Sequence, residues 1–256
     1  ATGYSSLYTN AASFTNKGIE LDLRLTPLVK FRDGGVEFRA NATYIDNKVS
    51  HVAENLDAVG VGGFTDFAMN YVVQDMPAFV WRAVDWNRDD QGRVIVDAET
   101  GRPSPNPILT TYGRTQPLWI LGLTPSVNWK GFNLTALFEY RAGHYAYHGI
   151  GPDMAWTGSS IYSGRNNRER FVFPNSVYED PNNPGSYIPN PDITVNNVND
   201  FYTGEYRDVA SNFLTSAASW RFREASISYA IPVEQFLGNT FIKGANFSLT
   251  GRNLIL

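Results

Sequence analysis

The segment that decides the fold is Gly18-Ile19-Glu20-Leu21-Asp22-Leu23-Arg24-Leu25-Thr26, in which apolar and polar residues alternate without a break. Successive side chains of a β-strand point to opposite faces, so the leucines and Ile19 share one face and the charged residues share the other. The segment is therefore predicted to be a strand with one apolar and one charged face.

Five more segments repeat this alternation, at residues 36–44, 119–129, 132–141, 220–231 and 245–256. Short turn-rich stretches join the first four in pairs: Arg32-Asp33-Gly34-Gly35, which follows Pro27, and Lys130-Gly131. Such spacing predicts β-hairpins. A third hairpin is predicted from residues 220–231, a turn around Pro232 to Gly244, and residues 245–256.

The fifth segment changes phase along its length. Its apolar residues are even-numbered at Trp220 and Phe222 but odd-numbered from Ala225 onward. One extra residue in a strand produces such a change, so a β-bulge is predicted near Arg223-Glu224.

The composition fits an all-β protein with many turns. Hydrophobic residues make up 43% of the 256 residues, aromatic residues 14%, and there are 22 Gly and 14 Pro. The absence of Cys excludes disulfides and thiolate metal sites, and a net charge of −4 gives no basic surface for nucleic acid. No apolar run approaches the ~18 residues of a membrane-spanning helix, but a strand of a membrane barrel needs only ~10 alternating residues.

The connections between the strands alternate between short and very long. Two intervals, at about residues 49–115 and 143–217, run to roughly 65 to 75 residues each, whereas a usual connection has ~4–6. Short turns at one end and long loops at the other are typical of an outer-membrane β-barrel with extracellular loops. The chain is therefore predicted to form part of a transmembrane antiparallel β-barrel.

In such a barrel the charged face must line the interior, because a charge that faces lipid at the membrane midplane costs ~2–4 kcal/mol. The residues predicted to line the lumen are Glu20, Asp22, Arg24, Arg39, Glu139, Arg141 and Arg252. Aromatic residues near the strand ends would form the girdles at the two membrane interfaces: Trp119, Trp129, Phe132, Tyr140, Trp220, Phe222 and Tyr229.

Six strands are too few to close a barrel, since single-chain barrels begin at about eight. The last segment, residues 245–256, also has no turn signal at its end. We therefore expect the chain to be a piece of a larger barrel or to be completed by strands from elsewhere.

Four stretches resemble one family of membrane proteins. They are Asn16-Lys17-Gly18-Ile19-Glu20-Leu21, Arg170-Phe171-Val172-Phe173-Pro174-Asn175-Ser176-Val177, Arg223-Glu224-Ala225-Ser226-Ile227-Ser228-Tyr229-Ala230-Ile231-Pro232 and Leu249-Thr250-Gly251-Arg252-Asn253-Leu254. In this order, from about residue 10 to the end, they resemble the C-terminal barrel region of SusC/RagA-type TonB-dependent transporters of Bacteroidetes outer membranes.

The resemblance implies a barrel of about 22 strands around an N-terminal plug, of which these six would be roughly strands 16 to 21. The plug and the final strand would lie outside residues 1–256. It also implies a SusD-like surface lipoprotein over the long loops, a TonB complex that supplies energy through parts absent from this chain, and a large glycan or peptide substrate. Such a protein imports a nutrient and is not an enzyme.

The long loops combine aromatic rings with polar groups, as sites for sugars and peptides do. The substrate-binding candidates are Trp81, Trp86, Tyr147 and Trp156. The same rings would equally serve to pack a loop against itself or against a partner.

No cofactor is expected from the motifs. The stretch from Asp85 to Gly92 has oxygen-bearing residues at alternate positions, but its glycine comes two places late for an EF-hand and Val96 stands at the last ligand position. An irregular calcium site in this loop is the one metal site left open. No nucleophile or phosphate-loop motif occurs.

Two other classes of protein fit the same alternation. One is a soluble β-sandwich that acts as an adhesin or carbohydrate-binding module, in which Leu21, Phe38 and Leu121 would be buried against a second sheet. The other is an all-β glycosidase, which requires two carboxylates a short distance apart in a cleft.

Overall fold

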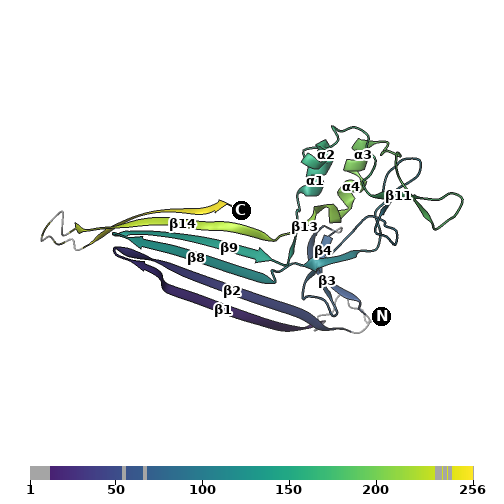
Figure 1. The fold of residues 1–256 in the computed structure, drawn as a ribbon. Coiled ribbons are helices and arrows are strands. Elements are labelled where there is room, and N and C mark those ends of the chain that lie inside the picture. Colours follow the sequence, from purple (N-terminus) through teal and green to yellow (C-terminus); the bar gives the residue numbers. More distant parts are fainter. Residues whose placement is uncertain are drawn as a thin grey trace. The chain divides into compact units, whose positions relative to one another are not determined.

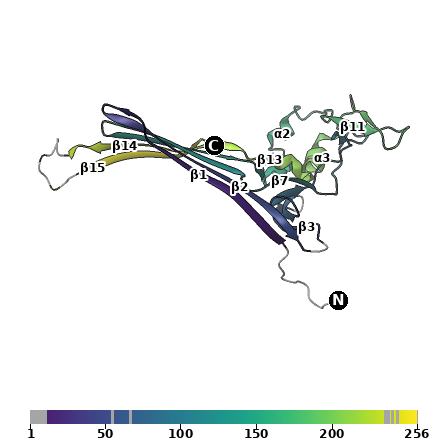
Figure 2. The ribbon, with the colours of Figure 1, turned by 60° about the horizontal axis from the view of Figure 1, so that its bottom comes forward.

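The computed structural model describes residues 12–53, 56–65, 68–233, 238, 241 and 244–255. The fold is all-β, and the chain divides into two compact units (Figures 1 and 2). The sheet unit comprises Thr15–Asn47, Gln116–His144 and Ser216–Leu256, and the loop unit comprises Ala1–Phe14, Lys48–Thr115 and Tyr145–Thr215. Among the described residues, no helix has the length and apolar content needed to cross a membrane.

The sheet unit is built on one six-stranded sheet whose order is β1-β2-β8-β9-β14-β15. Its strands are β1 (Ala12–Phe31), β2 (Gly34–Val52), β8 (Trp119–Trp129), β9 (Phe132–Ala142), β14 (Ser219–Ile231) and β15 (Ala245–Ile255). Strands β2, β8, β9, β14 and β15 pair antiparallel with their neighbours. All six predicted strands are therefore confirmed, although most of the connection predicted from Pro232 to Gly244, and Leu256, lie outside the described residues.

Strand β1 is longer than the alternation indicated. The alternation covers residues 18–26, but β1 continues through Pro27 to Phe31, and the turn of Arg32 and Asp33 lies within the predicted turn-rich stretch. Pro27 lacks a backbone N–H, so at this position β1 donates no hydrogen bond to a neighbouring strand.

The register keeps apolar and polar residues on separate faces across the strands. One apolar row runs Ala40, Leu123, Phe138, Phe222, and the adjacent polar row runs Asn41, Gly122, Glu139, Arg221. The predicted bulge is confirmed, because the register of β14 shifts between Phe222 and Glu224 against both neighbouring strands.

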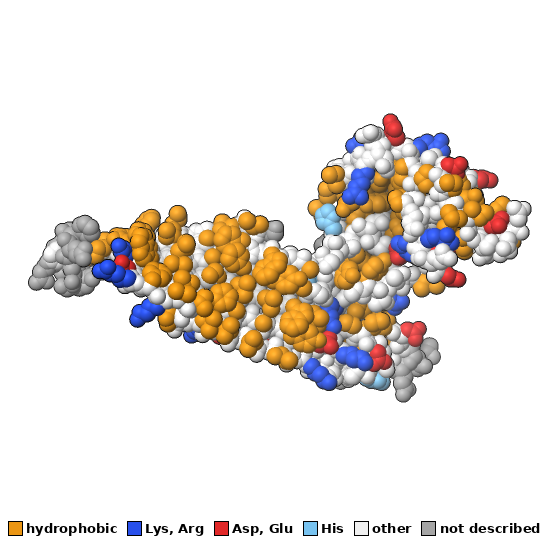
Figure 3. Space-filling view, viewed as in Figure 1, with side chains coloured by type: hydrophobic (Ala, Val, Ile, Leu, Met, Phe, Trp, Pro, Cys, Tyr) orange, Lys and Arg blue, Asp and Glu red, His pale blue; other side chains and the backbone are white. Residues whose placement is uncertain are grey.

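Within the described ranges, no second layer covers the apolar face of this sheet. Leu21 is 62% exposed and Leu249 is 65% exposed, and among the described residues of these strands within the sheet unit only Gly122 is buried. Hydrophobic side chains spread along the face of this unit that is turned toward the viewer in Figure 3. The β-sandwich alternative required Leu21 to be buried, so the exposure of this residue contradicts it.

The loop unit contains short elements that the alternation did not predict. A four-stranded sheet has the order β3-β4-β5-β7, a three-stranded sheet the order β12-β11-β6, and β10 pairs with β13. The strands are β3 (Ala58–Thr65), β4 (Ala68–Val73), β5 (Val80–Ala83), β6 (Val94–Ile95), β7 (Thr110–Arg114), β10 (Tyr145–Tyr147), β11 (Ser176–Glu179), β12 (Tyr187–Pro189) and β13 (Leu214–Ser216). The helices are α1 (Gly151–Trp156), α2 (Ile161–Gly164), α3 (Val198–Thr203), α4 (Glu205–Asp208) and the 3₁₀ helix η1 (Ala210–Phe213).

Aromatic packing holds these short elements together. The largest buried cluster is made of Trp86, Val94, Val195, Phe201, Tyr202 and Val209. The ring of Phe201 is stacked 6.1 Å from that of Trp86 and lies edge-on at 4.9 Å from that of Tyr202. The unit thus has its own hydrophobic core, which joins residues from both long intervals of the sequence.

Candidate functional site

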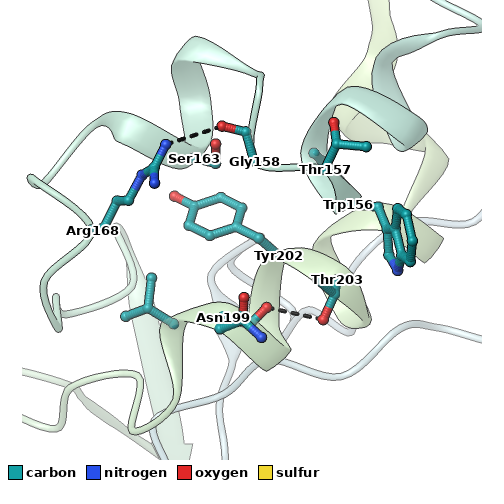
Figure 4. Close-up of a pocket in the computed structure, with 10 residues that line it drawn as sticks. Trp156, Thr157, Gly158, Ser163, Arg168, Asn199, Tyr202 and Thr203 are labelled. Atoms are coloured by element: carbon teal, nitrogen blue, oxygen red, sulfur yellow. Dashed lines mark hydrogen bonds between the residues drawn. The ribbon is translucent and has the colours of Figure 1, made fainter.

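A pocket of about 220 Å³ opens in the loop unit among the helices α1, α2 and α3 (Figure 4). Its lining combines two aromatic side chains with hydroxyl, amide and guanidinium groups: Ala155, Trp156, Thr157, Gly158, Ser163, Arg168, Val198, Asn199, Tyr202 and Thr203. We call this the loop pocket.

Local capping interactions fix the helices around the loop pocket. The hydroxyl of Ser160 accepts a hydrogen bond from the backbone N–H of Tyr162 at the start of α2. The side chain of Asn197 accepts one from the backbone N–H of Asp200 at the start of α3. Helices this short have little stability of their own, so these caps and the packing below them determine where the lining residues lie.

Tyr202 connects the loop pocket to the core. Its ring is buried, and its hydroxyl donates a hydrogen bond of 2.9 Å to the carbonyl oxygen of Tyr162. Burial raises the pKa of Tyr202, so the phenol stays protonated at neutral pH. Its ring therefore provides a fixed wall, while its hydroxyl is already engaged.

The other polar groups of the loop pocket are partly engaged with the backbone. Arg168 Nη2 donates to the carbonyl oxygen of Gly158 at 3.2 Å, and the hydroxyl of Thr203 donates to the carbonyl oxygen of Asn199 at 3.0 Å (Figure 4). A guanidinium keeps further N–H donors, and a hydroxyl that donates once can still accept. The lining has no Asp, Glu or His among its residues, so it offers binding groups without the carboxylate pair that a glycosidase requires.

The four loop aromatics predicted to bind substrate have different environments. Trp156 is 56% exposed and lines the loop pocket. Trp81 and Tyr147 lie together with ring centroids 5.8 Å apart, half-buried against the alanine cluster of Ala68, Ala83 and Ala210. Trp86 is only 4% exposed, and its Nε1 donates to Asn212 Oδ1 at 3.2 Å. The structure therefore places Trp86 in the core, where its ring surface is taken up by packing.

The residues predicted to line the lumen all belong to the sheet unit. Glu20, Asp22 and Arg39 border one groove of the sheet, and Arg24 and Arg39 border a second one. Arg141 Nε lies 2.9 Å from Glu139 Oε1, and Arg252 Nε donates to Glu224 Oε2 at 3.0 Å. The polar face is therefore mixed in charge and partly paired across strands, while the environment that it faces stays a prediction.

The acidic residues of the stretch considered for calcium are engaged with arginines. Asp85 accepts hydrogen bonds from Arg88 and from the hydroxyl of Ser211, and Asp89 accepts them from Arg93. Hydrogen bonds to these arginines lower the pKa of Asp85 and of Asp89 against the opposing effect of burial. Within the described ranges, no three acidic or histidine side chains converge as metal ligands.

Several residues of these surfaces were not predicted from the sequence. Arg168 and Asn199 of the loop pocket come from segments without periodicity, so no pattern marked them. Arg221 and Arg223 of β14 lie at the predicted bulge. The change of phase in the sequence at this point could have been used to predict that they face the lumen side of the sheet.

Neither a protein-family model nor a curated protein sequence matches the chain. Solved structures do match it in fold. They include the RagAB peptide transporter, with a TM-score of 0.64 and 17% identity, and the RagAB peptide importer in its "open-open" state, with 0.63 and 18%, and in its "closed-closed" state, with 0.62 and 18%. Each match covers 99% of this chain, whereas the chain spans only 26–27% of the RagAB chains.

Proposed function

We propose that this chain is part of an outer-membrane importer similar to the SusC/RagA-type transporters. In this proposal, the sheet unit contributes six strands to the barrel wall and the loop unit helps to bind a large nutrient, a peptide or a glycan. The observation that carries the proposal is the uncovered apolar face of the six-stranded sheet.

A membrane gives this face a partner. Residues such as Ile19, Leu21, Phe247 and Leu249 have more than three fifths of their surface exposed, whereas soluble proteins rarely leave large contiguous apolar patches uncovered. The opposite face carries the ion pairs, whose desolvation in lipid would be costly. Lipid on one side and a wet lumen on the other satisfy both faces.

Paired aromatic rings support the same orientation. Near the turn between β8 and β9, the rings of Phe132 and Tyr229 lie 4.4 Å apart. Near the other end of these strands, Tyr140 pairs with Trp220 at 4.8 Å, and Tyr44 with Trp119 at 4.7 Å. Aromatic residues at both ends of an apolar face are the expected girdles of a membrane barrel.

The similarity to solved structures supports a role in transport. The three RagAB structures named above are those of a peptide transporter, and each match extends over nearly all of this chain. Because the chain spans about a quarter of the RagAB chains, the substrate, a SusD-like partner and energy supplied by TonB are part of the proposal. The exposed ring of Trp156 and the donors of Arg168 and Asn199 suit a peptide or glycan at the loop pocket.

Uptake by cells tests the proposal. Cells that make the intact protein containing this chain should take up labelled oligopeptides or oligosaccharides, and cells in which its gene is deleted should lose that uptake. Uptake of single amino acids and monosaccharides, which pass through general porins, provides the control and should not change. Undiminished uptake of every oligomer in the deletion strain would contradict the proposed function.

A further inference from the structure

Three arginines of the polar face gather around one carboxylate near one end of strands β9 and β14. Arg221 is the direct cross-strand partner of Glu139. Arg141 Nε lies 2.9 Å and Arg223 Nε 3.7 Å from Glu139 Oε1. We call Arg141, Arg221, Arg223 and Glu139 the arginine cluster.

Arg221 and Arg223 are two residues apart in β14 and share its polar face, and the bulge beside them adds a carboxylate to that face. In a regular strand, Phe222 and Arg223 would be followed by a residue on the apolar face. Relative to β9, the register shift between Phe222 and Glu224 instead gives β14 one extra residue, and Arg223 reaches Glu139 while Glu224 pairs with Arg252 on the same face. A bulge that redirects a side chain in this way is common next to functional sites.

The arginine cluster has more positive charge than its carboxylate can neutralise. Three guanidinium groups face one Glu139, which leaves two positive charges in excess by this count. Glu139 forms ion pairs with Arg141 and Arg223, whereas Arg221 has no ion pair or hydrogen bond within the described part of the chain. Arg221 is half-buried, and its Nε is shielded from solvent without an acceptor.

Neighbouring groups do not supply the missing negative charge. The row of Arg221 continues through Glu139 to Gly122, which has no side chain, and then to Asn41, which is neutral. His144 lies close enough that its pKa is lowered by burial and by the charges of Arg141 and Arg221. The surroundings of Arg221 are thus positive and short of acceptors.

We propose that Arg221, with Arg141 and Arg223 beside it, binds a carboxylate of the transported substrate, and that the substrate class is an acidic peptide. A guanidinium presents donors in a fixed fork that matches a carboxylate in two parallel hydrogen bonds. The excess charge would also attract acidic peptides into the lumen. This inference rests on the proposed function, since it places the polar face in the transport path.

Binding of two matched peptides to the intact transporter tests the inference. The peptides carry the same label and differ only in having Glu or Gln at the acidic positions. The wild-type protein should bind the Glu peptide about tenfold more tightly at low salt, the effect of one charge-assisted pair, and the preference should shrink as NaCl is added.

Substitutions locate the site. Arg221→Gln should abolish the preference for the Glu peptide by weakening its binding to the level of the Gln peptide, and an unchanged tryptophan fluorescence spectrum would show that the variant is folded. Arg221→Lys should keep part of the preference, because the charge remains and the fork is lost. Arg32→Gln is the control: it removes the same charge in the β1–β2 turn, at the other end of the strands, and should have no effect.

The inference is overturned if the wild-type protein binds both peptides equally or binds neither, or if Arg221→Gln keeps the full preference. Inorganic phosphate that competes better than acetate would also overturn it, because the site would then prefer phosphoryl groups. None of these results depends on the uptake comparison above, so the proposed function and the acidic substrate can fail separately.

Discussion

Two lysine substitutions in β14, one on each face of the strand, test which face contacts lipid and which face lines the lumen. Ile227 and Ser228 are adjacent in β14, between the centre of the strand and the aromatic pair of Tyr229 and Phe132. Ile227 pairs with Leu134 of β9 and Leu249 of β15 on the apolar face, and Ser228 pairs with polar residues of the same two strands. The strand, its neighbours and the added charge are the same in the two variants, so only the face differs.

The expected costs of the two substitutions differ. A lysine that faces lipid destabilises a barrel by ~2–4 kcal/mol at the membrane midplane and by ~0–1 kcal/mol near the interfaces. A position between the two, such as Ile227, should therefore lose about 1–2 kcal/mol, which lowers the folding equilibrium constant about 5- to 30-fold. Ile227→Lys should show such a loss, because the side chain of Ile227 is 43% exposed on a face that no other described layer covers. Ser228→Lys adds a charge to a polar, hydrated face and should change stability by no more than about 0.5 kcal/mol.

The assay is reversible unfolding of the intact protein in lipid vesicles by guanidinium chloride, followed by tryptophan fluorescence. Equal costs for the two variants would refute the assignment of the faces. A cost below about 0.5 kcal/mol for Ile227→Lys would refute the contact of this face with lipid.

Three further predictions concern the loop unit and the surroundings of the arginine cluster. Trp86→Ala should destabilise the loop unit by about 3–5 kcal/mol and speed its proteolysis, since it removes a buried ring, whereas Trp156→Ala should leave proteolysis unchanged; equal effects would show that the two rings are equivalent. Gly101→Ala should lower the free energy of unfolding of the loop unit by about 1 kcal/mol or more, because Gly101 has a φ of +66° and an added Cβ would collide with the backbone of Thr194. If the variant and the wild type unfold at the same denaturant concentration, this prediction is wrong. The pKa of His144 is lowered in the folded protein, so on acidification the unfolded chain binds a proton at a higher pH than the folded one does, and the free energy of unfolding should fall as the pH drops below about 6.5. Histidine NMR should show a higher pKa of His144 in Arg221→Gln than in the wild type, because one neighbouring positive charge is removed. An unchanged pKa would exclude the influence of Arg221.

The sheet could be predicted because each of its strands has two chemically different faces. The alternation around Leu21 and Phe138 located strands, and the change of phase after Phe222 located the bulge. These signals are local and have period two, which a single sequence displays directly. The extension of β1 through Pro27 to Phe31 was not predicted, because the alternation stops at Thr26 and proline is uncommon inside a strand.

The interior of the loop unit could not be predicted in the same way. Its helices have four to six residues, too few to show a helical period, and their stability comes from contacts distant in sequence. Trp86 and Trp156 look alike in the sequence, both lying in long irregular intervals among polar residues. Only the packing of Trp86 against Phe201, which comes from the other interval, distinguishes a core ring from an exposed one.

Lipid contact along β9 tests the central claim most directly. This strand, Phe132–Ala142, is paired on both sides, and the chain contains no cysteine, so a nitroxide label can be attached at each position in turn. In bilayers, the account predicts frequent collisions with oxygen at the even positions 132–140 and with a water-soluble nickel complex at the odd positions 133–141. Accessibility that does not alternate, or that favours the nickel complex at the positions of Leu134 and Phe138, would contradict a membrane-facing apolar surface.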